Sequence, residues 1–350
     1  MFIYNVLLGL LFFFYILTFF KYWKQHPLSL LVFSCLFMLL IAAFKSISVG
    51  TDAENYYFYF QNVEVLKQNR IFKGIQRGWY YYNYFFHEYL SFRCFLFVNY
   101  AIIFIGFSYF LYKKSANCIT SILLFFLLYF FCASLNVMRQ YMAISIVLVG
   151  LTFFNKNKWK FCVCVLLASL FHYSALICYS FLLVHKKLSL NKTFYVMLFI
   201  IISFLLGFTF TDWLKGYIEQ ISIVDSLNEG ASSYVEQWGG ERNIVTNLLI
   251  NVMFLISYFL AKNRSSFYLK LYFLYIIFNN LFGSAGQGNR LFLYFNMGIL
   301  IALPEISSQL KNFYIRNIYN VIFIVYAYAI WYVSINANNG DVVPYLFSFD

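Results

Sequence analysis

Apolar runs of about 15 to 25 residues recur along the whole chain, and no other feature of the sequence constrains the fold as strongly. A bilayer offers no water to unpaired backbone groups, so each spanning segment must form its own hydrogen bonds, as a helix does. Barrel strands would instead alternate apolar and polar residues. Because 63% of the residues are hydrophobic and 11% are charged, the sequence predicts an all-α integral membrane protein. We expect one polytopic membrane domain over residues 1–350, with about 10–12 transmembrane helices.

Charged residues set the expected orientation of these helices. The formal net charge of +12 comes from Lys and Arg that lie mostly in short loops, where they mark the cytoplasmic side. This distribution gives no reason to expect nucleic-acid binding. It predicts two long outer segments, residues 45–92 and 212–243. The expected full spans are 3–20, 28–44, 94–112, 117–134, 139–154, 193–211, 244–261, 266–282, 291–303 and 317–334, with Pro304 ending the span that begins at 291.

Residues 161–184 do not fit a regular alternation of inside and outside loops. As one span they would place the basic residues that follow outside and the acidic loop 212–242 inside, against the positive-inside rule. We therefore expect a re-entrant hairpin that breaks near residues 169–174. A membrane tolerates such a hairpin where it lines a cavity or is buried in protein. A single span is the alternative.

Arg139 is the only formally charged residue between Lys114 and Lys156. As helix this interval would reach roughly 60 Å, which fits two crossings of a core about 30 Å thick better than one. A turn near Asn136 would place Arg139 at the outer end of this helical hairpin. By their spacing, Asn136, Arg139 and Gln140 share one helical face. We interpret Arg139 as a phosphate ligand supported by these two amides, because a guanidinium fork matches phosphate oxygens. A snorkelling arginine with a structural partner is the alternative.

A second arginine and a histidine extend this hypothesis. Arg290, like Arg139, precedes a helix that runs inward, and helix N-termini favour anions. Two arginines suit a diphosphate, and Tyr294 follows Arg290 by one turn, where it is placed to orient the guanidinium. His172 lies at the expected break of the re-entrant hairpin, where it is placed to contact a phosphate or a sugar hydroxyl. The alternatives are two unrelated interfacial arginines and a histidine that packs in the core.

Two acidic residues, Asp52 and Glu54, follow the second expected span. Either is placed to accept a proton from a hydroxyl, or to hold a sugar or a metal. Gly50 permits a close turn ahead of them. An ordinary polar loop at the end of a span would have the same composition, so this alternative stays open.

No nucleotide-binding loop, zinc-protease helix or nucleophile elbow occurs in the sequence. We therefore expect an activated donor for this chain to be carried on a lipid. We predict no cofactor and assign no metal ligand.

Five short motifs stand in order along essentially the whole chain: Gly50-Thr-Asp52 before a tyrosine-rich run, Asn136-Val-Met-Arg-Gln140, Phe171-His-Tyr-Ser-Ala175, Asn289-Arg290 with Leu293-Tyr294, and Val343-Pro-Tyr345. Together they resemble the EpsG family of Wzy-like polysaccharide polymerases. One position departs from the pattern. The family often has an acidic residue just ahead of a Gly-aromatic pair in the first outer loop, whereas this chain has Arg77 before Gly78-Trp79. This departure leaves Asp52 and Glu54 as the expected catalytic acids.

The resemblance implies a multi-pass enzyme of the bacterial inner membrane with its active site facing the periplasm. Such enzymes build O-antigen of lipopolysaccharide, capsule or exopolysaccharide by joining repeat units carried on undecaprenyl diphosphate. The implied partners are this lipid-linked oligosaccharide, membrane lipid and a chain-length regulator. The implied fold is Wzy-like, and the acidic first outer loop is also similar to that of GT-C glycosyltransferases.

The resemblance also implies roles for the candidate residues. Arg139 and Arg290 would bind the diphosphate and stabilise its charge as it leaves. Asp52, or Glu54 in its place, would accept the acceptor proton, and His172 would support the leaving group or the sugar. An O-antigen ligase or a polyprenyl-phosphate-sugar glycosyltransferase would share the phosphate site. A lipid-linked sugar transporter is the third hypothesis, although that class usually shows internal repeats and a site near mid-membrane.

Overall fold

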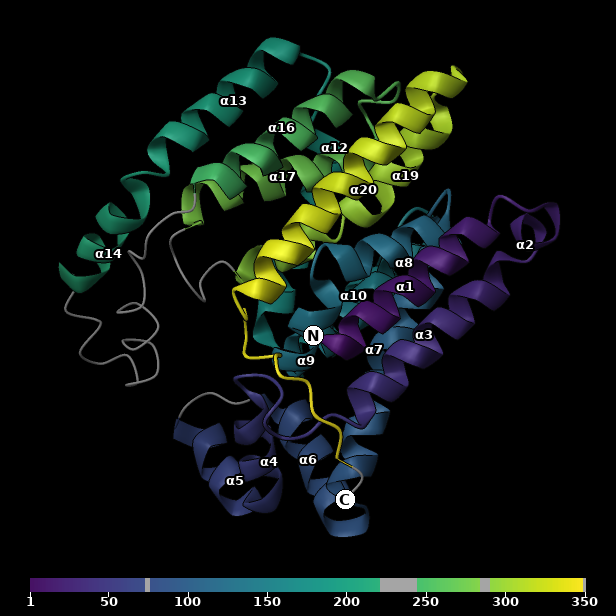
Figure 1. Cartoon of the computed structure of the whole chain (residues 1–350). Helices are drawn as coiled ribbons and strands as arrows, with labels where there is room; N and C mark the ends of the chain where they lie inside the picture. Colours follow the sequence, from purple (N-terminus) through teal and green to yellow (C-terminus); the bar gives the residue numbers. More distant parts are fainter. Residues whose placement is uncertain (73–75, 221–243, 284–289, 349–350) are drawn as a thin grey trace. The chain divides into compact units, whose positions relative to one another are not determined.

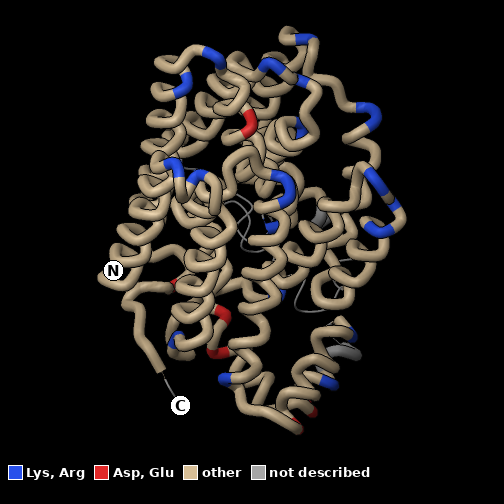
Figure 2. Tube along the Cα trace, turned by 90° about the vertical axis from the view of Figure 1, so that its right-hand side faces the viewer, with Lys and Arg blue, Asp and Glu red and all other residues tan. Residues whose placement is uncertain are grey.

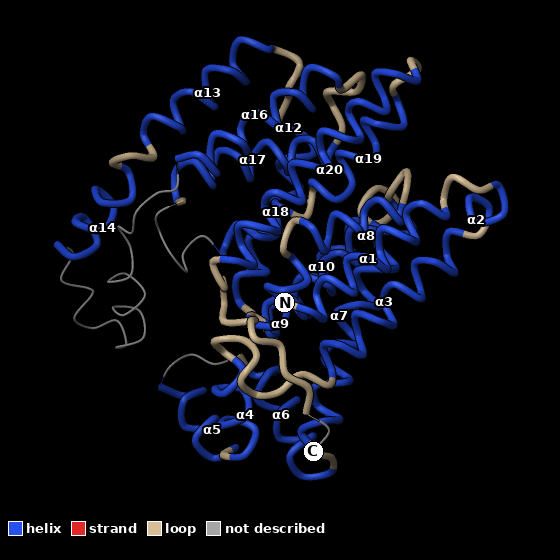
Figure 3. Tube along the Cα trace, in the orientation of Figure 1, coloured by secondary structure: helices blue, strands red, loops and turns tan. Residues whose placement is uncertain are grey.

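The computed structural model describes residues 1–72, 76–220, 244–283 and 290–348. Helices dominate these residues, and the one β-type pairing among them is an antiparallel bridge between Lys45 and Phe347 (Figure 3). The all-α prediction is therefore confirmed. The chain divides into two compact units: Met1–Tyr179 with Ile318–Asp350, and Ser180–Asn317. The prediction of a single membrane domain stays a prediction.

Within the described residues, three helices are long and apolar enough to cross a membrane: Phe92–Lys114, Arg290–Gln309 and Phe313–Asn336. Two bent helix pairs, Cys118–Leu127 with Phe130–Asn136 (57°) and Thr193–Leu206 with Phe210–Tyr217 (61°), would bring the spans to five. Shorter apolar helices, such as Pro27–Ala43 and Met138–Phe153, accompany them. Lys, Arg, Asp and Glu colour only a small part of the Cα trace (Figure 2). The chain is an all-α membrane protein, while the total of 10–12 crossings stays a prediction.

The first unit contains the N-terminal half of the chain and most of the C-terminal helix (Figure 1). Side-chain caps begin several of its helices: the Ser91 side chain accepts from the Cys94 amide at 3.2 Å, and Asn117 Oδ1 accepts from the Ile119 amide at 3.1 Å. The helices of this unit are α1 (Phe2–Leu17), α2 (Lys21–Gln25), α3 (Pro27–Ala43), α4 (Ala53–Gln61), α5 (Val63–Phe72), α6 (Arg77–Tyr89), α7 (Phe92–Lys114), α8 (Cys118–Leu127), α9 (Phe130–Asn136), α10 (Met138–Phe153), α11 (Lys158–Ser169) and most of α20 (Phe313–Asn336).

Helix α10 packs between α7 and α11 at the centre of this unit. Glycines bring the helices close together: a Cβ added to Gly106 on α7 would lie 2.9 Å from Ser145 Cβ on α10. A Cβ on Gly150 of α10 would lie 2.7 Å from Cys164 Cβ on α11. Small residues at crossings are the usual means of tight helix packing in membranes. Helix α10, which carries Arg139 in its first turn, is thus packed closely on two sides.

The predicted break in residues 161–184 is present. Helix α11 ends at Ser169, and a 3-10 helix, η1 (Tyr173–Ser180), follows after Phe171 and His172. The segment then continues into the second unit as α12 (Phe181–Lys187). Its return to the same membrane side stays a prediction.

The second unit is built on α17, which packs with α13, α16 and α19. Its helices are α12, α13 (Thr193–Leu206), α14 (Phe210–Gln220), α16 (Ile244–Leu260), α17 (Phe267–Phe282), α18 (Leu293–Asn296) and α19 (Ile299–Gln309). Pro304 does not end a helix, which corrects the sequence-based expectation, because α19 runs through it to Gln309. Proline removes one N–H donor, and burial of the neighbouring Leu300 and Leu303 holds the helix together. Of the expected outer segment 212–243, residues 221–243 lie outside the described residues.

Buried asparagines join three helices of the second unit. Asn251 on α16 and Asn280 on α17 pair reciprocally through their amides, at 2.8 and 3.0 Å. The Asn280 amide nitrogen also donates to Ser203 Oγ on α13 at 3.0 Å, and Asn279 donates to Asn247 at 2.6 Å. In a membrane such amide bonds are expected to hold helices in register.

Replacing Asn280 with leucine is expected to lower the free energy of unfolding by about 1–2 kcal/mol, since the Asn251 side-chain oxygen would lose the donor that Asn280 supplies in an apolar core, while the Asn251 amide nitrogen keeps its bond to the Asn247 carbonyl. Thermal unfolding in detergent measures the change. The double variant Asn251→Leu/Asn280→Leu is the control, because removing both partners leaves no orphaned amide. It is expected to recover part of the loss, and a double variant less stable than the single one would contradict this account.

Candidate active site

The loop between α3 and α4 carries Asp52 and is held by the C-terminal segment of the chain (Figure 1). The Gly50 amide donates to the carbonyl of Asp341 at 2.9 Å, and the Thr51 amide donates to that of Gly340 at 3.1 Å. The Tyr345 hydroxyl donates to the carbonyl of Ile41, in the last turn of α3 just ahead of this loop. Residues 338–348, here called the C-terminal strap, therefore fix the backbone just ahead of Asp52.

Arg93, on α7, holds both of these segments. Its guanidinium donates to the carbonyls of Ala43 at 2.7 Å and Lys45 at 3.2 Å, and to Ser348 Oγ at 2.9 Å. The guanidinium carries five N–H donors in a planar fork, and its two terminal nitrogens reach the three acceptors from different sides of the fork. The loop is thus anchored at its first residues as well as next to Asp52.

Gly50 has a φ of +103°, a conformation that other residues rarely adopt. A Cβ built on it would lie 3.0 Å from the Leu135 carbonyl oxygen and 3.3 Å from Asn136 Cα. The sequence-based expectation of a close turn at this glycine is confirmed. The loop therefore lies directly against the end of α9.

Replacing Gly50 with alanine is expected to lower the free energy of unfolding by about 1–3 kcal/mol, because the backbone conformation is strained and the Cβ meets another backbone. Thermal unfolding in detergent is the measurement. Gly9 is the matched control, since a Cβ there meets nothing within 4 Å. Equal stability of Gly50→Ala and Gly9→Ala would show that the loop does not need this approach.

Asn136 connects the Asp52 loop to the turn between α9 and α10. We call this turn the Arg139 turn, because Arg139 lies in the first turn of α10. Its side-chain oxygen accepts from the Asp52 amide at 2.8 Å. Asn136 is the last residue of α9, Val137 breaks the helix with φ −90° and ψ +52°, and Arg139 is the second residue of the next helix. The expectation that Asn136, Arg139 and Gln140 share one helical face is therefore wrong, because they lie on two helices. The turn predicted near Asn136 is present.

The Arg139 guanidinium has no counter-charge among the described residues. The side chain is half-buried and forms no hydrogen bond or ion pair with any other residue that the structure describes. Gln140, beside it, is buried. A partly desolvated cation without a partner carries a strong preference for an anion. Asp52 is half-buried and Glu54 is exposed, both at the start of α4.

His172 reaches the same region through a chain of contacts. The Trp79 amide, at the start of α6, donates to the carbonyl of Leu170, two residues before His172, at 3.2 Å. The Trp79 ring meets the Tyr56 ring of α4 with centroids 5.6 Å apart. The imidazole Nδ1 of His172 lies 2.5 Å from Ser174 Oγ. His172 is therefore linked to α4, the helix that follows Asp52, through Leu170, Trp79 and Tyr56.

Arg290 and Tyr294 belong to the second unit. Arg290 stands at the start of the span Arg290–Gln309, as expected, and is half-buried, while Tyr294 is buried. Phe292 fixes this start, because its ring stacks on Phe278 of α17 with centroids 4.2 Å apart. The role of Arg290 as a diphosphate ligand with Arg139, and of Tyr294 as its support, stays a prediction.

Lys45 is a candidate that the sequence analysis missed. It is 2% exposed, and its Nζ donates to the carbonyls of Val49 at 2.5 Å and Leu135 at 2.9 Å. Burial lowers the pKa of its ammonium to about 7, and the charge of Asp52 partly opposes this shift. In the sequence, Lys45 is a single lysine at the end of an apolar run, seven residues before Asp52. A lysine in this position is typical of the end of a membrane span, so nothing distinguished it as a site residue.

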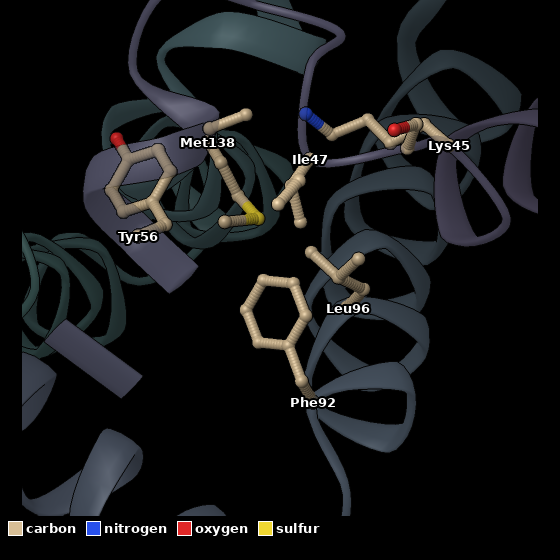
Figure 4. A pocket seen from close by; sticks show the side chains of 8 residues that line it. Lys45, Ile47, Tyr56, Phe92, Leu96 and Met138 are labelled. Carbon is tan, nitrogen blue, oxygen red and sulfur yellow. The ribbon is translucent and has the colours of Figure 1, made fainter. Parts of the chain in front are cut away.

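A small apolar groove lies beside Lys45 (Figure 4). The side chains labelled in Figure 4 converge on it, with Met138, the neighbour of Arg139, among them. It is lined by Lys45, Ser46, Ile47, Ala53, Tyr56, Phe92, Leu96 and Met138. No group of three or more His, Cys, Asp or Glu residues suited to a metal occurs in residues 1–72, 76–220, 244–283 and 290–348.

Comparison with known proteins identifies a family for this chain. The model of the EpsG family matches residues 28–347, and these residues include every motif quoted above. No curated protein and no solved structure matches the chain. Because the match covers nearly the whole sequence, this chain belongs to the EpsG family.

Proposed function

We propose that this protein is a membrane glycosyltransferase that polymerises undecaprenyl-diphosphate-linked oligosaccharide repeat units. EpsG family membership supports a role in polysaccharide biosynthesis. The single observation that carries the proposal is the arrangement at the α9–α10 turn. There, a half-buried guanidinium that bonds no residue in the described part of the chain lies three residues after the asparagine that holds the Asp52 backbone.

The proposed reaction joins two lipid-linked chains. A hydroxyl at the non-reducing end of the incoming unit attacks C1 of the sugar attached to the donor diphosphate. The new bond forms between C1 and that hydroxyl oxygen, the bond between C1 and the phosphate oxygen breaks, and undecaprenyl diphosphate leaves with the electron pair. Asp52 takes the hydroxyl proton, with Glu54 as the alternative base. Arg139 and Arg290 bind the diphosphate, and His172 supports the leaving group or the sugar.

The proposed setting is the bacterial inner membrane, with the reaction at the periplasmic face and with O-antigen, capsule or exopolysaccharide as the product. The proposed partners are the lipid-linked oligosaccharide, surrounding lipid and a chain-length regulator. No cofactor enters this scheme, since the activated donor supplies the energy of the new bond.

In vitro polymerisation tests the proposal. Lipid-linked repeat units isolated from a strain that lacks this gene are added to the purified protein in detergent or vesicles. A ladder of polymer without a second protein supports the polymerase. Transfer of the glycan to a lipid A core acceptor would instead show a ligase. Movement of the units across vesicles without a new glycosidic bond would show a transporter.

A further inference from the structure

The amino group of Lys45 bonds two segments that are far apart in the chain. Val49 O, one of its acceptors, lies in the loop that carries Asp52, and Leu135 O, the other, lies in the last turn of α9. The same two segments meet at the bond between the Asp52 amide and Asn136, and at the close approach of Gly50 to Leu135. The Asp52 loop and the Arg139 turn meet at this junction. Among the described residues there, Lys45 is the only charged side chain that bonds both segments.

Stability alone does not favour a lysine here. A buried amino group loses its hydration, and Lys45 forms no ion pair with any residue in the described part of the chain. An apolar side chain of similar length would fill the same space without that desolvation cost. Residues that violate the local rules of stability are expected where function sets the choice.

We propose that Lys45 is a positioning residue that fixes the Asp52 carboxylate relative to the Arg139 guanidinium. This role rests on the polymerase function proposed above. Lys45 does not touch the substrate in this account. It holds one carbonyl on each side of the junction, so that the loop and the turn keep one spacing when the negatively charged donor binds beside them. Without this link, the base and the diphosphate ligand would lose their fixed separation.

Lys45→Met tests the proposal, because methionine is similar in length and uncharged. We expect kcat for polymerisation to fall by about 10-fold to 100-fold, since small displacements of reacting groups have effects of this size. Two other results are expected to separate positioning from folding. The affinity for sugar-free undecaprenyl diphosphate stays near that of the wild type, because Arg139 is intact, and the melting temperature stays equal or rises.

Hydrogen exchange at the amides of residues 50–52 measures the link directly. These amides donate to Asp341, Gly340 and Asn136, and Lys45→Met is expected to speed their exchange. Lys270→Met is the matched control. Lys270 is also buried and donates to a backbone carbonyl, that of His185. It lies in the first turns of α17, in the second unit. Lys270→Met is expected to leave kcat and the exchange at 50–52 unchanged.

Each outcome decides the matter. Wild-type kcat in Lys45→Met, or an equal loss in Lys270→Met, would overturn the proposal. If Lys45→Met does not fold, Lys45→Gln replaces it: its shorter side chain cannot keep both bonds to the Val49 and Leu135 carbonyls, and unchanged kcat and exchange would again overturn the role. If the wild-type protein makes no polymer, the proposed function fails, and exchange at 50–52 then judges the link alone, with unchanged exchange refuting it.

Discussion

Replacing Arg139 with alanine is expected to reduce polymerisation by about 100-fold to 1,000-fold while the protein stays folded in the membrane. The guanidinium forms no bond with the described residues, so its removal breaks no internal contact. The Arg139→Ala variant would lose the stabilisation of the departing diphosphate, whose negative charge grows as the bond to C1 breaks. Cells that carry only Arg139→Ala are expected to display single repeat units instead of long chains, which gel analysis of the surface glycan measures.

Two further variants make this result specific. Arg139→Lys keeps the charge and loses the planar fork, so it is expected to restore part of the activity. Arg316→Ala on α20 is the matched control for removing an arginine, because Arg316 is also half-buried and its guanidinium lies over the Phe313 ring. It is expected to leave chain length unchanged. Normal polymer in Arg139→Ala would remove Arg139 from the site.

Replacing Asp52 with asparagine is expected to reduce kcat by about 100-fold to 10,000-fold, the range over which a positioned general base acts. The change is nearly isosteric. Asp52 stands at the N-terminus of α4, where its side chain forms no capping bond, and it is the backbone amide of Asp52 that bonds to Asn136. The fold and the hydrogen bond to Asn136 are therefore expected to remain in Asp52→Asn. The fall in kcat would then come from the loss of proton transfer to the carboxylate.

Glu54→Gln is the comparison for this variant. Glu54 lies two residues away and is exposed, whereas Asp52 is half-buried and its backbone is bonded to Asn136. We expect Glu54→Gln to retain most of the activity. A reversed pattern, with Asp52→Asn active and Glu54→Gln inactive, would transfer the role of base to Glu54.

Helix positions could be predicted from the sequence where an apolar run is long and ends at polar residues. The expected spans 28–44 and 139–154 correspond to helices Pro27–Ala43 and Met138–Phe153. Burial in lipid sets these limits, and it depends on local composition. Pro304 was misjudged because tertiary packing, which the sequence does not display, carries α19 past it.

The candidate site could be predicted only in part. Asp52 and Asn136 were named from their residue types, and the hydrogen bond between them brings them together. Lys45 was missed because nothing local distinguishes a lysine at a span end from one that is fully buried. Its burial depends on Leu135, in a distant helix, and on the loop that folds back over it.

The C-terminal strap has a consequence for biogenesis. The Asp52 loop is synthesised long before Gly340 and Asp341, whose carbonyls accept hydrogen bonds from its backbone. Until translation reaches these two residues, the growing protein lacks the bonds that shape this loop. Nascent chains halted ahead of Gly340 are therefore expected to enter the bilayer with the backbone before Asp52 not yet fixed.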